Sequence, residues 1–283
     1  MSNVATSRVE ARVVNHNTSE FAELALRTLV ATHQQRLAAG QLRVTVMDSH
    51  STDGGLNDLV AAASELGAAF QRSRWPAATA PVNSHGDVLR DFVAARHQAT
   101  HVFFVDADIV FTAPDCLGVM LAEIAASQDV WAVQARFHWD EDKHGPGASL
   151  DIWAGHHDQF WVGIGQTPVR PFAGRHKRRC NPACTLVANT PVFRSVAEII
   201  GLSAGVVVSA DEALAGFADT LGLASLAMRT HGLRYVLSAV TVGHYSGVSY
   251  DDPANPVDFK IEECRRRLAA LRAGATFDPG VFG

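Results

Sequence analysis

Short apolar runs and longer stretches with a helical repeat alternate along the first half of the chain. The apolar runs predict strands at 9–14, 42–47, 68–71 and 101–105. The stretches between them predict helices from Thr18 or Ser19 to about Gly40, up to about Leu66, and at 88–97. This repeated order of strand, turn and helix indicates an α/β protein with a mostly parallel sheet and helices on both faces.

Polar residues follow three of these strands at the point where each one ends. They occupy 15–17 (Asn-His-Asn), 48–53 (Asp-Ser-His-Ser-Thr-Asp) and 106–108 (Asp-Ala-Asp). The carboxyl ends of parallel strands lie on the same edge of a sheet, and ligands bind at that edge in folds of this class. We therefore expect the three turns to lie along one ligand-binding edge.

The second half of the chain is less regular. Helices are predicted at 114–126, 192–200, 211–221 and 261–272, and strands at 130–135, 185–188 and 235–242. Residues 137–179 are rich in His, Trp, Gly and Asp and show little periodicity, which is typical of a functional segment inside a folded chain. No internal repeat and no clear linker interrupt the pattern, so we expect one domain.

Composition argues against several classes of protein. The chain has 283 residues, 47% of them hydrophobic, which is enough apolar surface for a folded core. A net charge of −5 and a pI near 6.2 argue against a nucleic-acid partner. Asp211, Glu212 and Asp219 interrupt the longest apolar stretch, 206–228, so no transmembrane segment is expected.

Two further features bear on the cellular compartment. The four cysteines have an irregular spacing that fits neither a disulfide framework nor a zinc site, so we expect reduced thiols. The N-terminal residues include charges but no apolar core of a signal peptide. Both features favour a cytoplasmic protein.

Asp106 and Asp108 are the strongest chemical signal in the sequence. Four apolar residues lead into this pair, so both carboxylates are expected at the end of a buried strand. Alternate residues of an extended segment point the same way, which would let two carboxylate oxygens face one site. Mg²⁺ and Mn²⁺ take such oxygen ligands and commonly share them with substrate phosphates. The alternative is a pair of solvated turn acids.

The turn at 48–53 holds two more carboxylates, for which we expect different roles. Asp48 is the last residue of its strand and is well placed to accept hydrogen bonds from a ligand. Asp53 stands just before the next predicted helix, and capping of that helix is its expected role.

Three segments in this order resemble the family-2-like GT-A glycosyltransferases: 13–17 (Val-Val-Asn-His-Asn), 44–54 (Val-Thr-Val-Met-Asp-Ser-His-Ser-Thr-Asp-Gly) and 103–108 (Phe-Phe-Val-Asp-Ala-Asp). Those enzymes share an apolar strand with a polar turn, a turn of the form vvDngStDgt and a metal motif of the form lflDaDd. The resemblance covers about residues 8–136 and implies a GT-A, Rossmann-like fold with a smaller acceptor-side subregion. His50 replaces the Asn or Gly that is common in the family between the two aspartates.

The resemblance also implies roles for the residues that match. Asp48 would contact the nucleobase or its ribose, and Asn15 and Asn17 would line the nucleotide pocket. Asp106 and Asp108 would hold the ribose and a Mn²⁺ or Mg²⁺ ion on the diphosphate.

Downstream of these segments the match is weaker. Asp211-Glu212-Ala213-Leu214 falls where the family tends to carry E-D-x-x-L, which would make Asp211 the catalytic base and Glu212 its alternative. Ala210 stands where the family has Glu, and acids that favour a helix N-terminus explain the segment equally well. His244 matches the late histidine that GT-A enzymes often use as an additional metal ligand.

Together these features predict a metal-dependent, inverting glycosyltransferase that moves a sugar from a nucleoside-diphosphate sugar, with a UDP-sugar favoured, to a hydroxyl acceptor such as a polysaccharide precursor or natural product. Residues 1–136 would form the nucleotide-sugar half, and residues 137–283 the acceptor half and C-terminal helix, of a single GT-A domain. Two alternatives stay open: a haloacid-dehalogenase-type phosphatase that uses Asp106, and a non-catalytic nucleotide-sugar-binding module. The sequence leaves the oligomeric state open.

Overall fold

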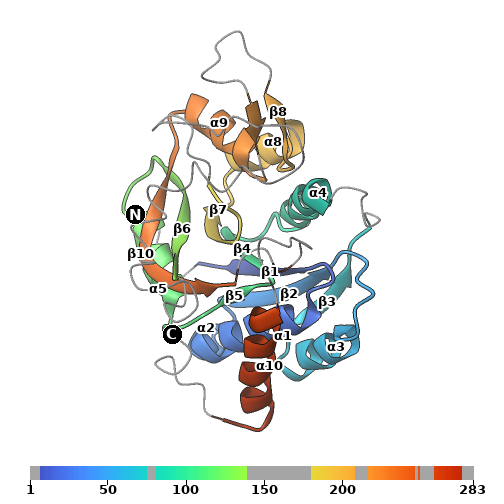
Figure 1. The fold of residues 1–283 in the computed structure, drawn as a ribbon. Helices are drawn as coiled ribbons and strands as arrows, with labels where there is room; N and C mark the ends of the chain where they lie inside the picture. Colours follow the sequence, from blue (N-terminus) through green and yellow to red (C-terminus); the bar gives the residue numbers. More distant parts are fainter. Residues whose placement is uncertain are drawn as a thin grey trace, which may run out of the picture.

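In the described part of the chain, eight strands form one sheet in the order β3-β2-β1-β4-β7-β6-β10-β5 (Figure 1). The strands are β1 (Val9–Asn15), β2 (Leu42–Asp48), β3 (Ala69–Arg72), β4 (His101–Asp106), β5 (Ile109–Val110), β6 (Val130–His138), β7 (Cys184–Ala188) and β10 (Arg234–His244). A separate antiparallel pair consists of β8 (Gly205–Val207) and β9 (Gly216–Ala218). The computed structural model describes residues 7–74, 81–138, 180–207, 216–218, 220–245, 248 and 258–275.

The strands on the N-terminal side of the sheet are all parallel. β1 pairs in parallel with β2 on one side and with β4 on the other, and β2 pairs in parallel with β3. β6 and β10 form a further parallel pair, whereas β7 is antiparallel to both β4 and β6, and β5 is antiparallel to β10. The predicted α/β fold with a mostly parallel sheet is confirmed.

Helices cover both faces of this sheet (Figure 1). α1 (Ser19–Thr32), α3 (Leu56–Glu65), α5 (Cys116–Ala125) and α10 (Asp258–Arg272) contribute to a hydrophobic core on one face. α4 (Pro81–Ala94), α8 (Pro191–Ile199) and α9 (Gly222–Thr230) contribute to a second core on the other face. The short helix α2 (Gln34–Ala38) follows α1.

The central strands are buried on both faces, which explains why their sequences are almost continuously apolar. In β4, Phe103 and Val105 belong to the first core, whereas Val102 and Phe104 belong to the second. Arg12 on β1 is the exception to this pattern: it lies beside Phe104 in the sheet and is fully buried although it is charged.

The order of the strands reverses at β1, where a binding crevice is expected. From β1 the chain passes outward to β2 and β3, and it then returns to the other side of β1 to form β4. α1 and α3 cover one face, whereas α4, which leads into β4, covers the other. Open α/β sheets bind ligands at such a reversal, outside the carboxyl ends of the strands. Asn15 at the end of β1 and Asp106 at the end of β4 therefore flank the expected binding crevice.

The prediction of a helix over 211–221 is wrong. Gly216–Ala218 forms strand β9, which pairs with β8, and α9 begins only at Gly222. Leu221 precedes α9 in a left-handed backbone conformation, with φ of 64°. A short apolar segment has no period that distinguishes strand from helix, so the sequence did not separate these elements.

The helix expected to run to about Gly40 ends earlier, at Thr32. His33 interrupts it, because its Nδ1 lies 2.8 Å from the carbonyl oxygen of Leu29 and its Nε2 accepts a hydrogen bond from the backbone N–H of Leu117 at 3.2 Å. The imidazole thereby joins the end of α1 to the start of α5, and the chain resumes as α2.

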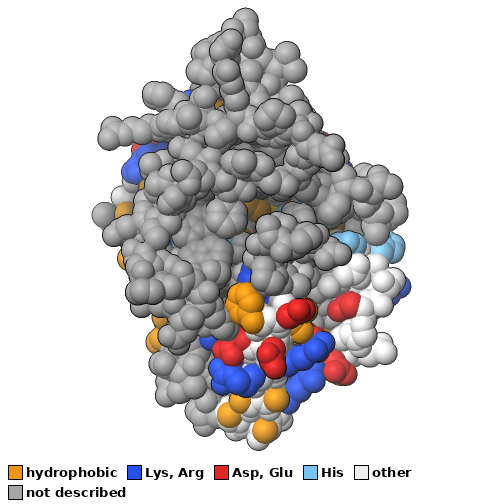
Figure 2. All heavy atoms as spheres, in the orientation of Figure 1, with side chains coloured by type: hydrophobic (Ala, Val, Ile, Leu, Met, Phe, Trp, Pro, Cys, Tyr) orange, Lys and Arg blue, Asp and Glu red, His pale blue; other side chains and the backbone are white. Residues whose placement is uncertain are grey.

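Ion pairs connect the C-terminal helix α10 to α1. Arg272 pairs with Glu23, and Arg265 pairs with Glu20 at 2.9 Å. Figure 2 shows acidic and basic side chains mixed over this part of the surface. The arginine-rich helix therefore presents mixed charge here.

The thiols are buried, as is common for cysteines that form no disulfide. Cys116, Cys180, Cys184 and Cys264 are buried and form no disulfide. Burial raises the pKa of the Cys264 thiol to about 12. Among the helices that the structure describes, none has the length and hydropathy needed to cross a bilayer.

Gly86 in α4 generates a prediction about stability. A Cβ at this position would lie 2.1 Å from the Cα of Ser203, in the loop after α8. We predict that Gly86→Ala lowers the free energy of unfolding by about 1–3 kcal/mol, because overpacking against backbone outweighs the higher helix propensity of alanine. Gly54→Ala is the control, since a Cβ there meets nothing within 4 Å. Urea unfolding measures both variants, and equal stability would show that the loop does not pack closely on α4.

Candidate functional site

The turns after β1 and β2 are joined through the side chain of Asn15. Parallel pairing puts Asn15 beside Asp48, the last residue of β2. The Asn15 Nδ2 lies 3.0 Å from Asp48 Oδ1, 2.9 Å from Ser19 Oγ and 3.1 Å from Ser51 Oγ, and its Oδ1 accepts from the backbone N–H of Thr18 at 3.3 Å. Asn15 and Asp48 are both fully buried. Asn15 therefore holds the Asp48 carboxylate in one orientation.

The Asp48 carboxylate also faces the end of β3. Its Oδ2 accepts from the backbone N–H of Ser51 at 3.3 Å and lies 3.6 Å from Nε of Arg72. The Arg72 side chain is 60% exposed, so it connects the buried carboxylate to the surface. The ends of three neighbouring strands thus contribute polar groups to one edge of the sheet.

Two residues of these turns have left-handed backbone conformations: Asn17 with φ of 53° and His50 with φ of 58°. Asn17 is exposed; its backbone N–H donates to Ser51 Oγ at 2.9 Å, and its Oδ1 accepts from the backbone N–H of Thr52 at 2.8 Å. Gly and Asn adopt this conformation more readily than other residues. His50 adopts this conformation although it is neither Gly nor Asn.

Asp53 caps a different helix from the one predicted. Its carboxylate accepts from the backbone N–H of Ser19 at 2.9 Å and from Ser19 Oγ at 2.8 Å. Ser19 is the first residue of α1, so Asp53 satisfies the helix after β1 and not α3, which follows it in the sequence. The side chain of Thr18 makes no capping hydrogen bond.

Asp106 lies across the crevice, at the end of β4. Its Oδ1 is 3.2 Å from Nε2 of His85 on α4, an ion-pair separation without hydrogen-bond alignment. Burial raises the pKa of Asp106, but His85 and, after it, Arg12 outweigh this and hold the pKa below its usual value. The carboxylate is therefore ionised at neutral pH.

Asp108 faces a different histidine. Residues 107 and 108 form a turn, so the two carboxylates do not leave one extended segment as the sequence pattern suggested. Asp108 Oδ1 lies 3.4 Å from Nε2 of His244 at the end of β10. The pairing of β5 with β10 brings them together: Ile109 is opposite His244, and the backbone N–H of Tyr245 donates to the Asp108 carbonyl at 3.0 Å.

Asp108, Asp106 and Lys260 all act on the pKa of His244. Burial lowers the pKa of this imidazole, but Asp108 and, to a smaller extent, Asp106 outweigh burial and raise the pKa above its usual value. Lys260 on α10 is 2% exposed and opposes this rise. Burial lowers the pKa of Lys260, and Asp108 counteracts part of that effect.

Arg12, His85 and Lys260 were not predicted as residues of this site. Arg12 places a charge within an apolar run, and that unusual position is the one sequence signal that could have identified Arg12 as a site residue. His85 and Lys260 come from helices that meet Asp106 and Asp108 only in the folded chain, and no spacing in the sequence indicates this.

The side chains at this edge supply some, but not all, of the ligands that a metal ion needs. Asp108 and His244 come from two elements and bring a carboxylate oxygen and an imidazole nitrogen together. Within the described ranges, no three His, Cys, Asp or Glu side chains are grouped closely enough to hold a metal by themselves. An ion here needs further oxygens from a bound diphosphate or from water, as is usual for Mg²⁺. Asp211 and Glu212 lie outside the described residues.

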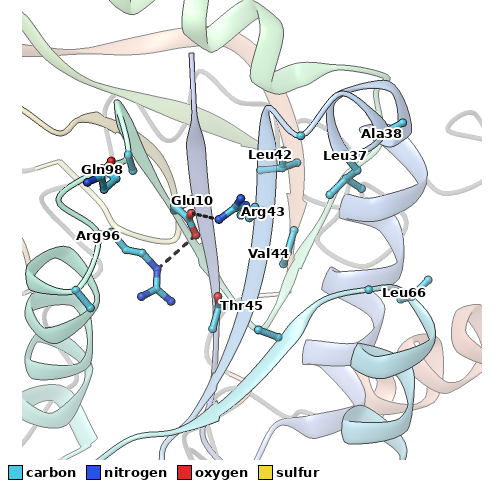
Figure 3. Close-up of a pocket in the computed structure, with 15 residues that line it drawn as sticks. Glu10, Leu37, Ala38, Leu42, Arg43, Val44, Thr45, Leu66, Arg96 and Gln98 are labelled. Carbon is cyan, nitrogen blue, oxygen red and sulfur yellow. Dashed lines mark ion pairs between the residues drawn. The ribbon is translucent and has the colours of Figure 1, made fainter. Parts of the chain in front are cut away.

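A cavity of about 850 Å³ lies at the opposite end of the sheet (Figure 3). Glu10, Arg43 and Arg96 line it, and Glu10 pairs with Arg96 at 3.4 Å and with Arg43 at 3.9 Å. It lies at the amino ends of β1 and β2, so it is separate from the candidate site at their carboxyl ends.

The capping role of Asp53 generates a prediction about stability. Asp53→Ala removes both hydrogen bonds to Ser19 and is expected to lower the free energy of unfolding by about 1–2 kcal/mol. Asp58→Ala is the control, because its exposed pair with Arg272 at 3.1 Å should contribute under about 1 kcal/mol. Chemical unfolding curves compare the two. A smaller loss for Asp53→Ala than for Asp58→Ala would contradict the capping role.

No family model matches the chain, and no curated protein matches it. The chain is similar to a crystal structure of a mycobacterial protein, with a TM-score of 0.50 and 14% identity over 88% of this chain and 70% of that one. It is also similar to glucosyl-3-phosphoglycerate synthase from Mycobacterium tuberculosis in complex with phosphoglyceric acid, with a TM-score of 0.49 and 15% identity over 95% and 80% of the two chains. The same synthase in complex with Mn²⁺ and uridine-diphosphate-glucose gives a TM-score of 0.46 and 14% identity over 95% and 79%. At 14% identity the likeness to the mycobacterial protein is one of fold.

Proposed function

We propose that this chain is a metal-dependent, inverting glycosyltransferase that moves a sugar from a nucleoside-diphosphate sugar, with a UDP-sugar favoured, to a hydroxyl of a polysaccharide precursor or a natural product. The observation that carries the proposal is that Asp48 ends β2, Asp106 ends β4 and Asp108 follows β4, so that all three carboxylates belong to the carboxyl edge of the sheet on either side of β1. The synthase structure described above holds uridine-diphosphate-glucose and Mn²⁺. We assign the same class of donor and ion to this chain. We also expect the enzyme to be cytoplasmic.

Asp48 and Arg72 are the proposed nucleoside end of the site. The Asp48 carboxylate can accept hydrogen bonds from a nucleobase N–H or a ribose hydroxyl, and Arg72 supplies donors beside it. Asn15 supports this role because its amide already holds Asp48 Oδ1 at 3.0 Å. Asn15 thus acts on the ligand through Asp48, whereas Asn17 is exposed at the same edge.

Asp106, Asp108 and His244 are the proposed diphosphate end. A bound Mn²⁺ or Mg²⁺ stabilises the negative charge that develops on the leaving phosphate. Asp108 and His244 would hold the ion, and Asp106 would contact the ribose and the ion. Lys260 adds a buried positive charge beside Asp108, which favours an anionic ligand at this end.

Asp211 is the proposed general base, with Glu212 as its alternative. A carboxylate takes the proton of the acceptor hydroxyl while the oxygen attacks the anomeric carbon. The attack comes from the face opposite the diphosphate, so a single displacement inverts the configuration at that carbon. Residues 137–283 would bind the acceptor in this scheme, and residues 1–136 the donor.

The two alternatives gain less support from the site. A haloacid-dehalogenase-type phosphatase usually carries its nucleophile on the first strand, whereas β1 here ends at Asn15, whose amide is no nucleophile. A non-catalytic nucleotide-sugar-binding module would bind the donor without turning it over. Metal-dependent hydrolysis of a nucleotide sugar would distinguish an enzyme from such a module.

A thermal-shift screen of UDP-, GDP- and dTDP-sugars with Mn²⁺ or EDTA tests the proposed function. We expect one nucleotide class to raise the melting temperature by about 5 °C at a hundredfold excess over its Kd, because a ligand that binds only the folded state stabilises it. The shift should be larger with Mn²⁺ than with EDTA. No shift with any of the three donors would contradict the proposal.

Asp108→Asn tests the metal assignment. The amide keeps the shape of the carboxylate but loses its charge, so we expect UDP affinity in Mn²⁺ to fall to the value measured in EDTA. Asp129→Asn is the matched control, since that residue pairs with Arg234 at 2.7 Å on the surface. Calorimetric titration of UDP measures both variants. If Asp108→Asn keeps the full effect of Mn²⁺, Asp108 does not hold the ion.

A further inference from the structure

Arg12 on β1 is completely buried, and no group among the described residues accepts a hydrogen bond from its side chain. Its side chain is 0% exposed, and Nε, Nη1 and Nη2 all lack an acceptor. Buried charged groups are strongly destabilising unless they are paired, and native structures rarely leave them unsatisfied. A guanidinium in this state has hydrogen-bond donors that a bound acceptor could use.

The neighbours of Arg12 do not supply that partner. Glu10 lies on the same face of β1, but its carboxylate pairs with Arg43 and Arg96 at the other end of the sheet. The Arg12 guanidinium carbon lies 5.5 Å from the centre of the Phe104 ring, a contact that stabilises the charge but accepts no hydrogen bond.

The groups above Arg12 are also incompletely satisfied. Asp106 lies on the adjacent strand, one row of residues closer to the carboxyl edge, since Arg12 is opposite Phe104 and Val14 is opposite Asp106. Asp106 Oδ1 and His85 Nε2 are both buried atoms without a hydrogen-bond partner. His85 on α4 and Arg12 on β1 both act on the Asp106 carboxylate, so two donor groups lie near one acceptor at the end of β4.

We propose that Arg12, together with His85, binds an anionic oxygen of the phosphate class in the expected binding crevice. The inference rests on the proposed function and deepens it, because the diphosphate of the donor supplies such oxygens. The planar guanidinium can donate two parallel hydrogen bonds to a phosphate, which makes arginine well suited to this ligand. Asp106 repels an anion, but it accepts hydrogen bonds from the hydroxyls that a nucleoside diphosphate also carries.

The charge state of Arg12 agrees with this role. Burial lowers the pKa of Arg12 to about 9, and Asp106 acts in the opposite direction. The guanidinium therefore stays protonated at neutral pH. It offers a phosphate a permanent charge that is already desolvated, so binding requires little further loss of water.

Arg12→Met tests the proposal through stability and binding together. Removing an unpaired buried charge should leave the melting temperature of the free protein equal to or above that of the wild type. We expect affinity for inorganic pyrophosphate, titrated in EDTA, to fall about 10- to 100-fold, the effect of losing charge-assisted hydrogen bonds. UDP affinity should fall similarly, whereas uridine affinity should stay within about twofold of the wild-type value. Arg43→Met, at the other end of the sheet, should change none of these.

Arg12→Lys keeps the test decisive if the methionine variant does not fold. It retains the charge without the planar fork, so we expect an intermediate loss of pyrophosphate affinity. Unchanged pyrophosphate affinity, or equal losses for uridine and pyrophosphate with a lower melting temperature, would overturn the inference. Arg12-dependent binding of pyrophosphate without binding of any nucleotide sugar would refute the proposed function but not this inference. Nucleotide-sugar binding that is independent of Arg12 would refute this inference but not the proposed function.

Discussion

The parallel pairing of β1 with both β2 and β4 is the constraint on which the candidate site depends. Its register puts Asn15 opposite Asp48 and Val14 opposite Asp106, so the polar ends of three strands reach the same edge. A slip of one residue would turn each side chain to the other face of the sheet and bury the carboxylates in a hydrophobic core. Because β4 is apolar on both faces, its interior alone would tolerate such a slip, and the polar residues at the strand ends select the register.

The polar groups at this edge hold one another before any ligand binds. Asn15 orients Asp48, His85 lies against Asp106, and His244 lies against Asp108. Groups that are already oriented need little reorganisation when charge develops on a substrate, which is the main electrostatic advantage of an enzyme site. Burying these charged groups is unfavourable for folding. The apolar packing on both faces of the sheet offsets this cost, and the site itself contributes little to it.

The sequence predicted the parts of the structure that depend on local patterns. β4 was identifiable because a strand buried on both faces is continuously apolar, and β1 and β2 were identifiable as apolar-rich runs that polar turns follow directly. Features that depend on distant contacts were not identifiable. Asp53 caps α1 across the turn, β5 has only two residues, and β9 has no distinguishing period. His85 reaches Asp106 only after α4 packs on the sheet, so no spacing in the sequence connects them.

A crystal structure of the chain with UDP and Mn²⁺, with data collected at a wavelength that gives anomalous scattering from manganese, tests the central claim most directly. We predict an anomalous peak between Asp108 and His244 and a uracil ring beside Asp48, with the diphosphate extending past the carboxyl ends of β1 and β4. A peak away from these residues, or a nucleotide bound in the cavity lined by Glu10 at the other end of the sheet, would contradict it.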